Sequence, residues 1–132
     1  MGFDQYHEPP EELSPETRTF ARLCASLTEE AEAIGWYEQR LAVEADADAR
    51  AIMSDAVEEE FKHFAMDLEF LLRRTPRWRQ ICEGVLFQEG DIVENGEAAE
   101  AASGDDGGDG GEKNGANADD SLGIGSLKGG ER

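Results

Sequence analysis

The spacing of apolar residues in the first half of the chain restricts its fold more than any other feature. Apolar side chains recur from Phe20 to Leu41 in steps of three, four and seven residues, and a second set runs from Ile52 to Leu71. Such steps place one apolar stripe on each of two helices. No segment of the first 90 residues alternates with the period of two that is typical of strands. The sequence therefore predicts an all-α fold.

Capping residues predict where the two long helices begin and end. Ser14 precedes a proline at the first helical position, which places the first helix at about 15–44. Asp46 or Asp48 caps the second helix, which extends from about 48 to 74. Because only a few residues separate the two helices, they are predicted to form an antiparallel hairpin.

A short third helix is predicted after the hairpin. Thr75 before a proline provides a new cap, and apolar residues at helical spacing continue to about residue 87. Gly84 is expected to weaken the middle of this helix. The predicted helical domain therefore covers residues 14–90, and the polar, proline-interrupted residues 1–13 are expected to form an N-terminal arm.

The charge of the chain argues against several classes of function. The 132 residues include 31 acidic and 12 basic side chains, so the formal net charge is −19. A polyanion of this kind repels nucleic acid and anionic lipid. No apolar run approaches the roughly 20 residues of a membrane span, and the N-terminus lacks the basic and apolar regions of a secretory signal. We therefore expect a cytoplasmic protein that binds neither nucleic acid nor membrane.

The last third of the chain differs in composition from the rest. Eleven of the 15 glycines lie beyond residue 90, among acidic and small residues. Residues 91–120 are therefore predicted to be a disordered, acidic, glycine-rich linker without a core. Aliphatic residues return within 121–132, where they cannot reach the core, and they predict a peptide that docks on another protein. The docking residues are expected to be Leu122, Gly123, Ile124, Gly125, Ser126 and Leu127.

Glu60 and His63 form a Glu-x-x-His pair within the apolar stripe of the second helix. Helical residues three apart share a face, so the carboxylate and the imidazole point the same way. A carboxylate in an apolar stripe is costly unless it is protonated, paired or bound to a metal. Glu30 lies at the edge of the apolar face of the first helix. These three residues predict a transition-metal site, and a Glu–His pair at a subunit interface is the alternative.

The predicted ligands amount to half of a carboxylate-bridged di-iron site. Such sites take one Glu from each of two helices and one Glu-x-x-His from each of two others. One chain supplies one helix of each kind, so a two-fold homodimer that forms a four-helix bundle would complete the site. A folding unit of about 75 residues is also only marginally stable alone. Burial and metal binding therefore predict the same dimer.

Glu29, Glu32 and Trp36 project from the opposite side of the first helix. They predict a second acidic site, distinct from the first, at another subunit contact. A solvated acidic face that carries one exposed aromatic residue is the alternative.

Two further side chains lie beside the predicted ligands. Tyr37 has nearly the same angular position as Glu30, where it either hydrogen-bonds a ligating carboxylate or is an aromatic residue at the core edge. Asp67 follows His63 by four residues, where it either accepts the second imidazole N–H or is a solvated or capping acid. The sequence leaves both pairs of alternatives open.

Three runs of the sequence resemble the encapsulated ferritins of bacteria. They are EEAEAIGWYEQR at residues 29–40, EEFKH at 59–63 and LFQEG at 86–90. Residues 7–9 of the arm also fit this family. The terminal residues 121–129 resemble the cargo-loading peptide that docks such proteins inside encapsulin shells.

The resemblance implies a ferritin-like fold, an assembly and an activity. It implies a ring, typically a decamer built from dimers, with a di-iron ferroxidase centre at each dimer interface. It further implies that Fe(II) is oxidised with dioxygen and stored as a mineral inside an encapsulin nanocompartment. A non-catalytic, acidic metal-binding cargo protein of the same shell is the alternative.

The resemblance also implies roles for individual residues. The ferroxidase ligands match Glu30, Glu60 and His63. A site where iron enters, which would also accept Ca²⁺ or other divalent ions, matches Glu29, Glu32 and Trp36. Tyr37 matches a residue beside the ferroxidase site. Asp67 departs from the neutral polar residue expected at its position, and Gly84 is unexpected within the third helix.

Overall fold

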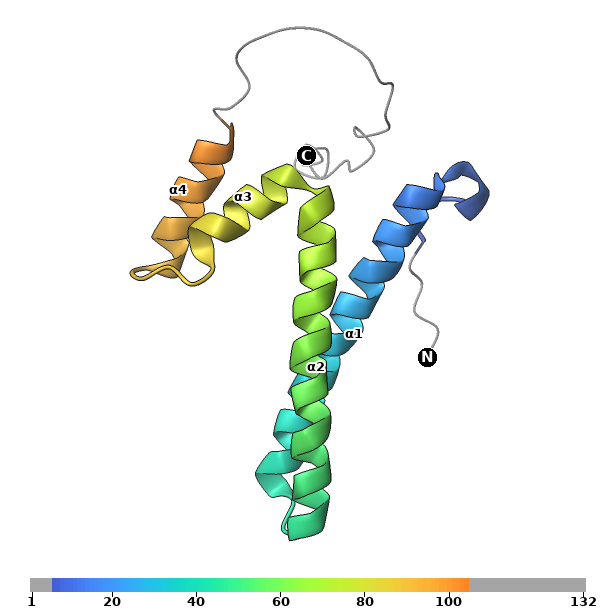
Figure 1. Cartoon of the computed structure of the whole chain (residues 1–132), viewed down its shortest axis with the longest axis vertical. Helices are drawn as coiled ribbons and strands as arrows, with labels where there is room; N and C mark the ends of the chain where they lie inside the picture. The colour runs from blue at the N-terminus through green and yellow to red at the C-terminus, as the bar shows by residue number, and fades with distance from the viewer. Residues whose placement is uncertain (1–5, 105–132) are drawn as a thin grey trace, which may run out of the picture.

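The computed structural model describes residues 6–104, and every regular element in that range is a helix (Figure 1). After a 3₁₀ turn at Pro10–Glu12 come α1 (Pro15–Val43), α2 (Ala47–Arg74), α3 (Pro76–Val85) and α4 (Ile92–Gly104). The predicted all-α fold is therefore confirmed. No helix within residues 6–104 combines the length and the hydropathy needed to span a bilayer.

Helices α1 and α2 form the predicted antiparallel hairpin, and their ends lie within one residue of the predicted limits. The side chain of Ser14 caps α1 by accepting a hydrogen bond from the backbone N–H of Thr17 at 3.1 Å. Asp46, rather than Asp48, caps α2, since its carboxylate accepts the N–H of Ala49 at 2.8 Å. Local side-chain hydrogen bonds thus fix both helix starts, as their sequence signatures indicated.

The core of the single chain is thin. Within residues 6–104, Leu71 is the one large side chain that is fully buried, and α1 and α2 diverge toward the N-terminal end of α1 (Figure 1). Ile52, predicted to lie on the buried face of α2, is 70% exposed, and Phe61 is also exposed. The hairpin alone therefore covers only part of its apolar surface.

Helix α3 turns away from the hairpin at Thr75, and the chain then reverses into α4 (Figure 1). The helix ends at Val85, two residues before the predicted limit. The reversal uses two positive φ angles, +62° at Phe87 and +96° at Gly90. The side chain of Asp91 then caps the start of α4 by accepting a hydrogen bond from the backbone N–H of Glu94 at 2.9 Å.

Helix α4 corrects the prediction that residues 91–120 are a disordered linker, because Ile92–Gly104 is helical and packs on α3. The physical reason is the close approach of Gly84 and Ala99. A Cβ atom added at Gly84 would lie 2.5 Å from the Cβ of Ala99, so only a glycine permits this contact. Helical structure therefore continues beyond residue 90 as far as residue 104, while residues 105–120 and 121–132 lie outside the described residues.

The Gly84–Ala99 contact predicts how a methyl group added at Gly84 affects the packing of α4 on α3. Gly84→Ala should destabilise the packing of α4 on α3 by about 1–3 kcal/mol, the usual cost of overpacking. Amide hydrogen exchange across residues 92–104 should accelerate in this variant. Adding Ala99→Gly should restore slow exchange, since it removes the atom that the new methyl group meets. Unchanged exchange in Gly84→Ala would show that this contact does not hold α4.

Candidate metal centre

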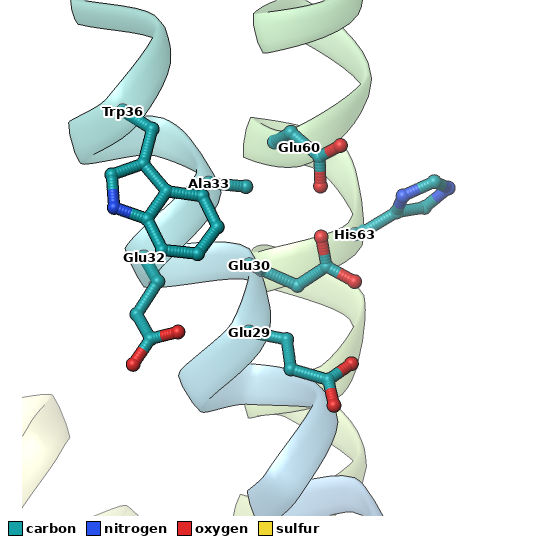
Figure 2. A pocket seen from close by; sticks show the side chains of 7 residues that line it. All are labelled: Glu29, Glu30, Glu32, Ala33, Trp36, Glu60 and His63. Carbon is teal, nitrogen blue, oxygen red and sulfur yellow. The ribbon is translucent and has the colours of Figure 1, made fainter. Parts of the chain in front are cut away.

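The carboxylates of Glu30 on α1 and Glu60 on α2 lie close together between the two helices, and the His63 ring of α2 lies beside them and projects outward (Figure 2). Each residue offers one ligand atom, and these atoms lie within 4.8 Å of one another. The structure therefore brings together the three residues that the helical spacing singled out. Because they come from two helices, the hairpin itself assembles the group.

The electrostatics of Glu30 reflect a crowded pair of carboxyl groups. A hydrogen bond with Glu60, followed by loss of solvent and by the negative charge of Glu60, raises the pKa of Glu30 to about 7. The charge of Asp67 acts in the same direction, and His63 opposes it. Two like charges this close require a proton or a cation to neutralise them.

The donor set fits a divalent transition metal. Two carboxylates and one imidazole are the ligand types that iron, manganese and zinc accept, whereas calcium prefers a shell of oxygen atoms alone. Glu30 and Glu60 are half-buried, and the His63 side chain is 47% exposed. One side of the cluster therefore stays open for further donors.

The cluster lies in an open hollow of about 450 Å³ on the hairpin. Its lining comprises Glu29, Glu30, Glu32, Ala33, Trp36, Glu60 and His63 (Figure 2). The sequence predicted two separate acidic sites on opposite sides of the first helix, but in the single chain both line this one hollow. Ala33 also lines the hollow and contributes only a methyl group to it. A small residue three positions after Glu30, on the same helix face, is the sequence signal for this arrangement.

Glu29, Glu32 and Trp36 form the outer part of the hollow. Trp36 is half exposed, and Figure 2 shows its indole ring beside the cluster. Within residues 6–104, neither Glu29 nor Glu32 forms an ion pair or a side-chain hydrogen bond. The hollow therefore concentrates negative charge next to the three converging ligands.

Tyr37 and Asp67, the two other side chains of interest, lie outside the lining of the hollow. The Tyr37 ring packs under the guanidinium group of Arg40, 5.3 Å from the ring centroid. One carboxylate oxygen of Asp67, Oδ2, is buried and has no hydrogen-bond partner among the described residues. Burial raises the pKa of Asp67, and the neighbouring His63 lowers it.

The chain is similar in sequence to the members of a known protein family. A family profile described as EncFtn-like matches residues 5–89. An encapsulated ferritin-like protein of Rhodospirillum rubrum is 43% identical over 123 residues, which cover 93% of this chain and 87% of the relative. A ferritin-like protein of Thermotoga maritima is 43% identical over 91 residues, which cover 69% of this chain and 80% of the relative.

A solved structure agrees with these sequence matches. The crystal structure of a protein from Nitrosomonas europaea superimposes with a TM-score of 0.66 at 39% sequence identity. The match covers 68% of this chain and 99% of the other. Sequence and fold therefore lead to one conclusion: this chain belongs to the EncFtn-like family.

Proposed function

We propose that this protein is a ferroxidase that oxidises Fe(II) to Fe(III) with dioxygen. The observation that carries the proposal is the convergence of Glu30, Glu60 and His63 within 4.8 Å in a ferritin-like chain. Carboxylate and imidazole donors bind Fe(II), and the two carboxylates stabilise the higher charge of Fe(III) more strongly. The donor set thus favours the oxidised product over the substrate.

The complete centre needs a second copy of the chain. Two copies related by a two-fold axis would provide Glu30, Glu60 and His63 twice, enough ligands for two iron ions. The exposure of Ile52 and Phe61 supports this pairing, since a four-helix bundle would cover apolar surface that the hairpin leaves open. Further association of such dimers into a ring, a decamer by family resemblance, completes the proposed assembly.

The chemistry that we assign to the centre is an electron transfer from a pair of substrate ions. Each Fe(II) gives one electron to dioxygen, so two neighbouring ions supply two electrons together. Glu30 gives up its shared proton when iron binds, because the cation replaces that proton between the two carboxylates. Tyr37 stays a proposed neighbour of the centre, as a hydrogen-bond donor to a ligating carboxylate.

The outer acids of the hollow are proposed to collect iron. Glu29 and Glu32 have no basic partner among the described residues, and they lie beside the converging ligands with Trp36 (Figure 2). At a second contact between subunits, these residues would form a site for Fe(II), Ca²⁺ or other divalent ions. The net charge of −19 would attract such ions from a distance.

Storage is proposed to take place inside an encapsulin shell. The Rhodospirillum rubrum relative is described as encapsulated. In this chain, residues 121–132 would supply the docking peptide, through Leu122, Gly123, Ile124, Gly125, Ser126 and Leu127. An open hairpin has no internal chamber for a mineral, so a separate compartment is needed.

A non-catalytic metal buffer of the same shell is the second candidate. The exposed, unpaired carboxylates Glu29 and Glu32 favour it, because such groups bind cations without any change in oxidation state. The two candidates differ in a single observable, the consumption of oxygen.

Oxygen uptake tests the ferroxidase directly. Adding Fe(II) to the purified oligomer should consume oxygen faster than buffer alone, because the paired ligands favour Fe(III). His63→Ala and Glu60→Ala should reduce uptake to the buffer rate while retaining helicity. Glu58→Gln provides a control on the same helix outside the hollow. Wild-type uptake in His63→Ala would contradict the site, and no uptake in the intact oligomer would favour the buffer.

The raised pKa of Glu30 predicts how metal-free stability varies with pH. In the unfolded chain Glu30 loses its proton near its ordinary pKa of 4.5, whereas in the folded chain it keeps the proton until about pH 7. The free energy of unfolding should therefore fall as the pH rises through that window. At pH 8 with chelator present, Glu30→Gln should unfold at a higher temperature than the wild type, but added Zn(II) should not raise its unfolding temperature further. Glu38→Gln, an exposed change on the same helix, should behave like the wild type in both measurements.

Removal of residues 121–132 should separate oxidation from encapsulation. The shortened protein should consume oxygen at the wild-type rate, because the ligands lie in α1 and α2. It should no longer co-purify with a co-expressed encapsulin shell. A full-length variant with Leu122, Ile124 and Leu127 changed to Ser should behave in the same way. Loading of either variant at the wild-type level would refute the docking assignment.

A further inference from the structure

Asp67 has a buried oxygen whose hydrogen-bonding capacity is unused. Its Oδ2 atom is inaccessible to solvent and accepts no hydrogen bond within residues 6–104. A buried polar atom without a partner costs free energy of roughly 1–3 kcal/mol. An acceptor retained in this state suggests that its donor arrives only when the site is in use.

The position of Asp67 on α2 determines which donor it can meet. Asp67 follows His63 by one helical turn, so both side chains lie on the same face. Helical side chains lean toward the N-terminus, which directs the Asp67 carboxylate back over His63. The mutual electrostatic effects of Asp67, His63 and Glu30 agree with this proximity.

Among the described residues, the imidazole of His63 has no hydrogen-bond partner. Its Nε2 atom is 4.0 Å from Oε2 of Glu59, beyond hydrogen-bonding distance. Glu59 is 54% exposed and already bonded to Lys62. When one ring nitrogen binds a cation, the other carries a proton and needs an acceptor. Oδ2 of Asp67 is a buried acceptor without a hydrogen bond among the described residues, whereas Oε2 of Glu59 belongs to an exposed side chain and already accepts a hydrogen bond from Lys62.

We propose that Asp67 is a positioning residue of the metal centre, which accepts a hydrogen bond from the non-coordinating N–H of His63 when a divalent cation is bound. This inference rests on the proposed metal centre and adds to it a residue outside the converging group. The hydrogen bond selects one tautomer of His63 and turns the exposed ring toward Glu30 and Glu60. The negative charge of Asp67 also makes the imidazole a stronger donor to the cation.

Affinity for Zn(II), which undergoes no oxidation, tests the inference on the full-length oligomer. Competition with a chelator should show Asp67→Leu binding Zn(II) about 10–100-fold more weakly than the wild type. Asp67→Asn should lose less, because its side-chain carbonyl still accepts the N–H. Glu59→Gln should bind as the wild type does. Helicity and oligomer size of each variant are measured alongside.

A spectroscopic readout distinguishes positioning from packing. In the Zn(II)-loaded wild type, NMR should show a slowly exchanging imidazole N–H proton, assigned to His63 by its absence in His63→Ala. This signal should disappear in Asp67→Leu and remain in Glu59→Gln. Wild-type affinity together with a retained signal in Asp67→Leu would overturn the inference, as would loss of the signal in Glu59→Gln. Wild-type Zn(II) binding no tighter than that of His63→Ala would instead overturn the metal centre itself, and the inference with it.

Discussion

The close approach of Glu30 and Glu60 between α1 and α2 is the interaction on which the rest of this structure depends. Two carboxyl groups at this distance cannot both carry a charge without cost, and their interaction raises the pKa of Glu30 to about 7 in the metal-free hairpin. In the proposed metal centre, a divalent cation would bind both carboxylates and so link the two helices. In the proposed centre, a cation would therefore bind where the two carboxyl groups repel each other in the metal-free hairpin.

The thin core explains why this cost matters. Few large side chains are fully buried in the single chain, and several apolar ones are exposed along α2. A domain of this size has only a small free energy of unfolding. In the proposed dimer, one contact would cover the apolar surface and supply the missing donors, so assembly and metal binding would stabilise each other.

In the α3–α4 unit, a glycine without a side chain allows an additional helix to pack on the domain. Gly84 allows the backbone of α3 to meet Ala99 of α4, and this small contact replaces a conventional core. The family profile ends at residue 89, just before α4 begins. The chain between the last described helix and the proposed docking peptide is therefore residues 105–120, about half the length that composition suggested.

The sequence by itself determined the hairpin, the cap of α1 and the three side chains of the candidate metal centre, and it narrowed the cap of α2 to two aspartates. Each depends on local rules: helical periodicity placed Glu30, Glu60 and His63 on neighbouring faces of the two helices, and Ser14 and Asp46 act within the first turns that they cap.

Only the tertiary structure decided the features that depend on contacts between segments. Gly84 reads locally as a helix breaker, and its use became visible only with Ala99 beside it. Glycines and acids made residues 91–120 resemble a linker, although the first part of that range packs on α3. The common hollow of Glu29 and Glu30 and the vacant oxygen of Asp67 likewise depend on which side chains surround them. Local pattern fixes the direction of a side chain, but its neighbours fix what it can bind.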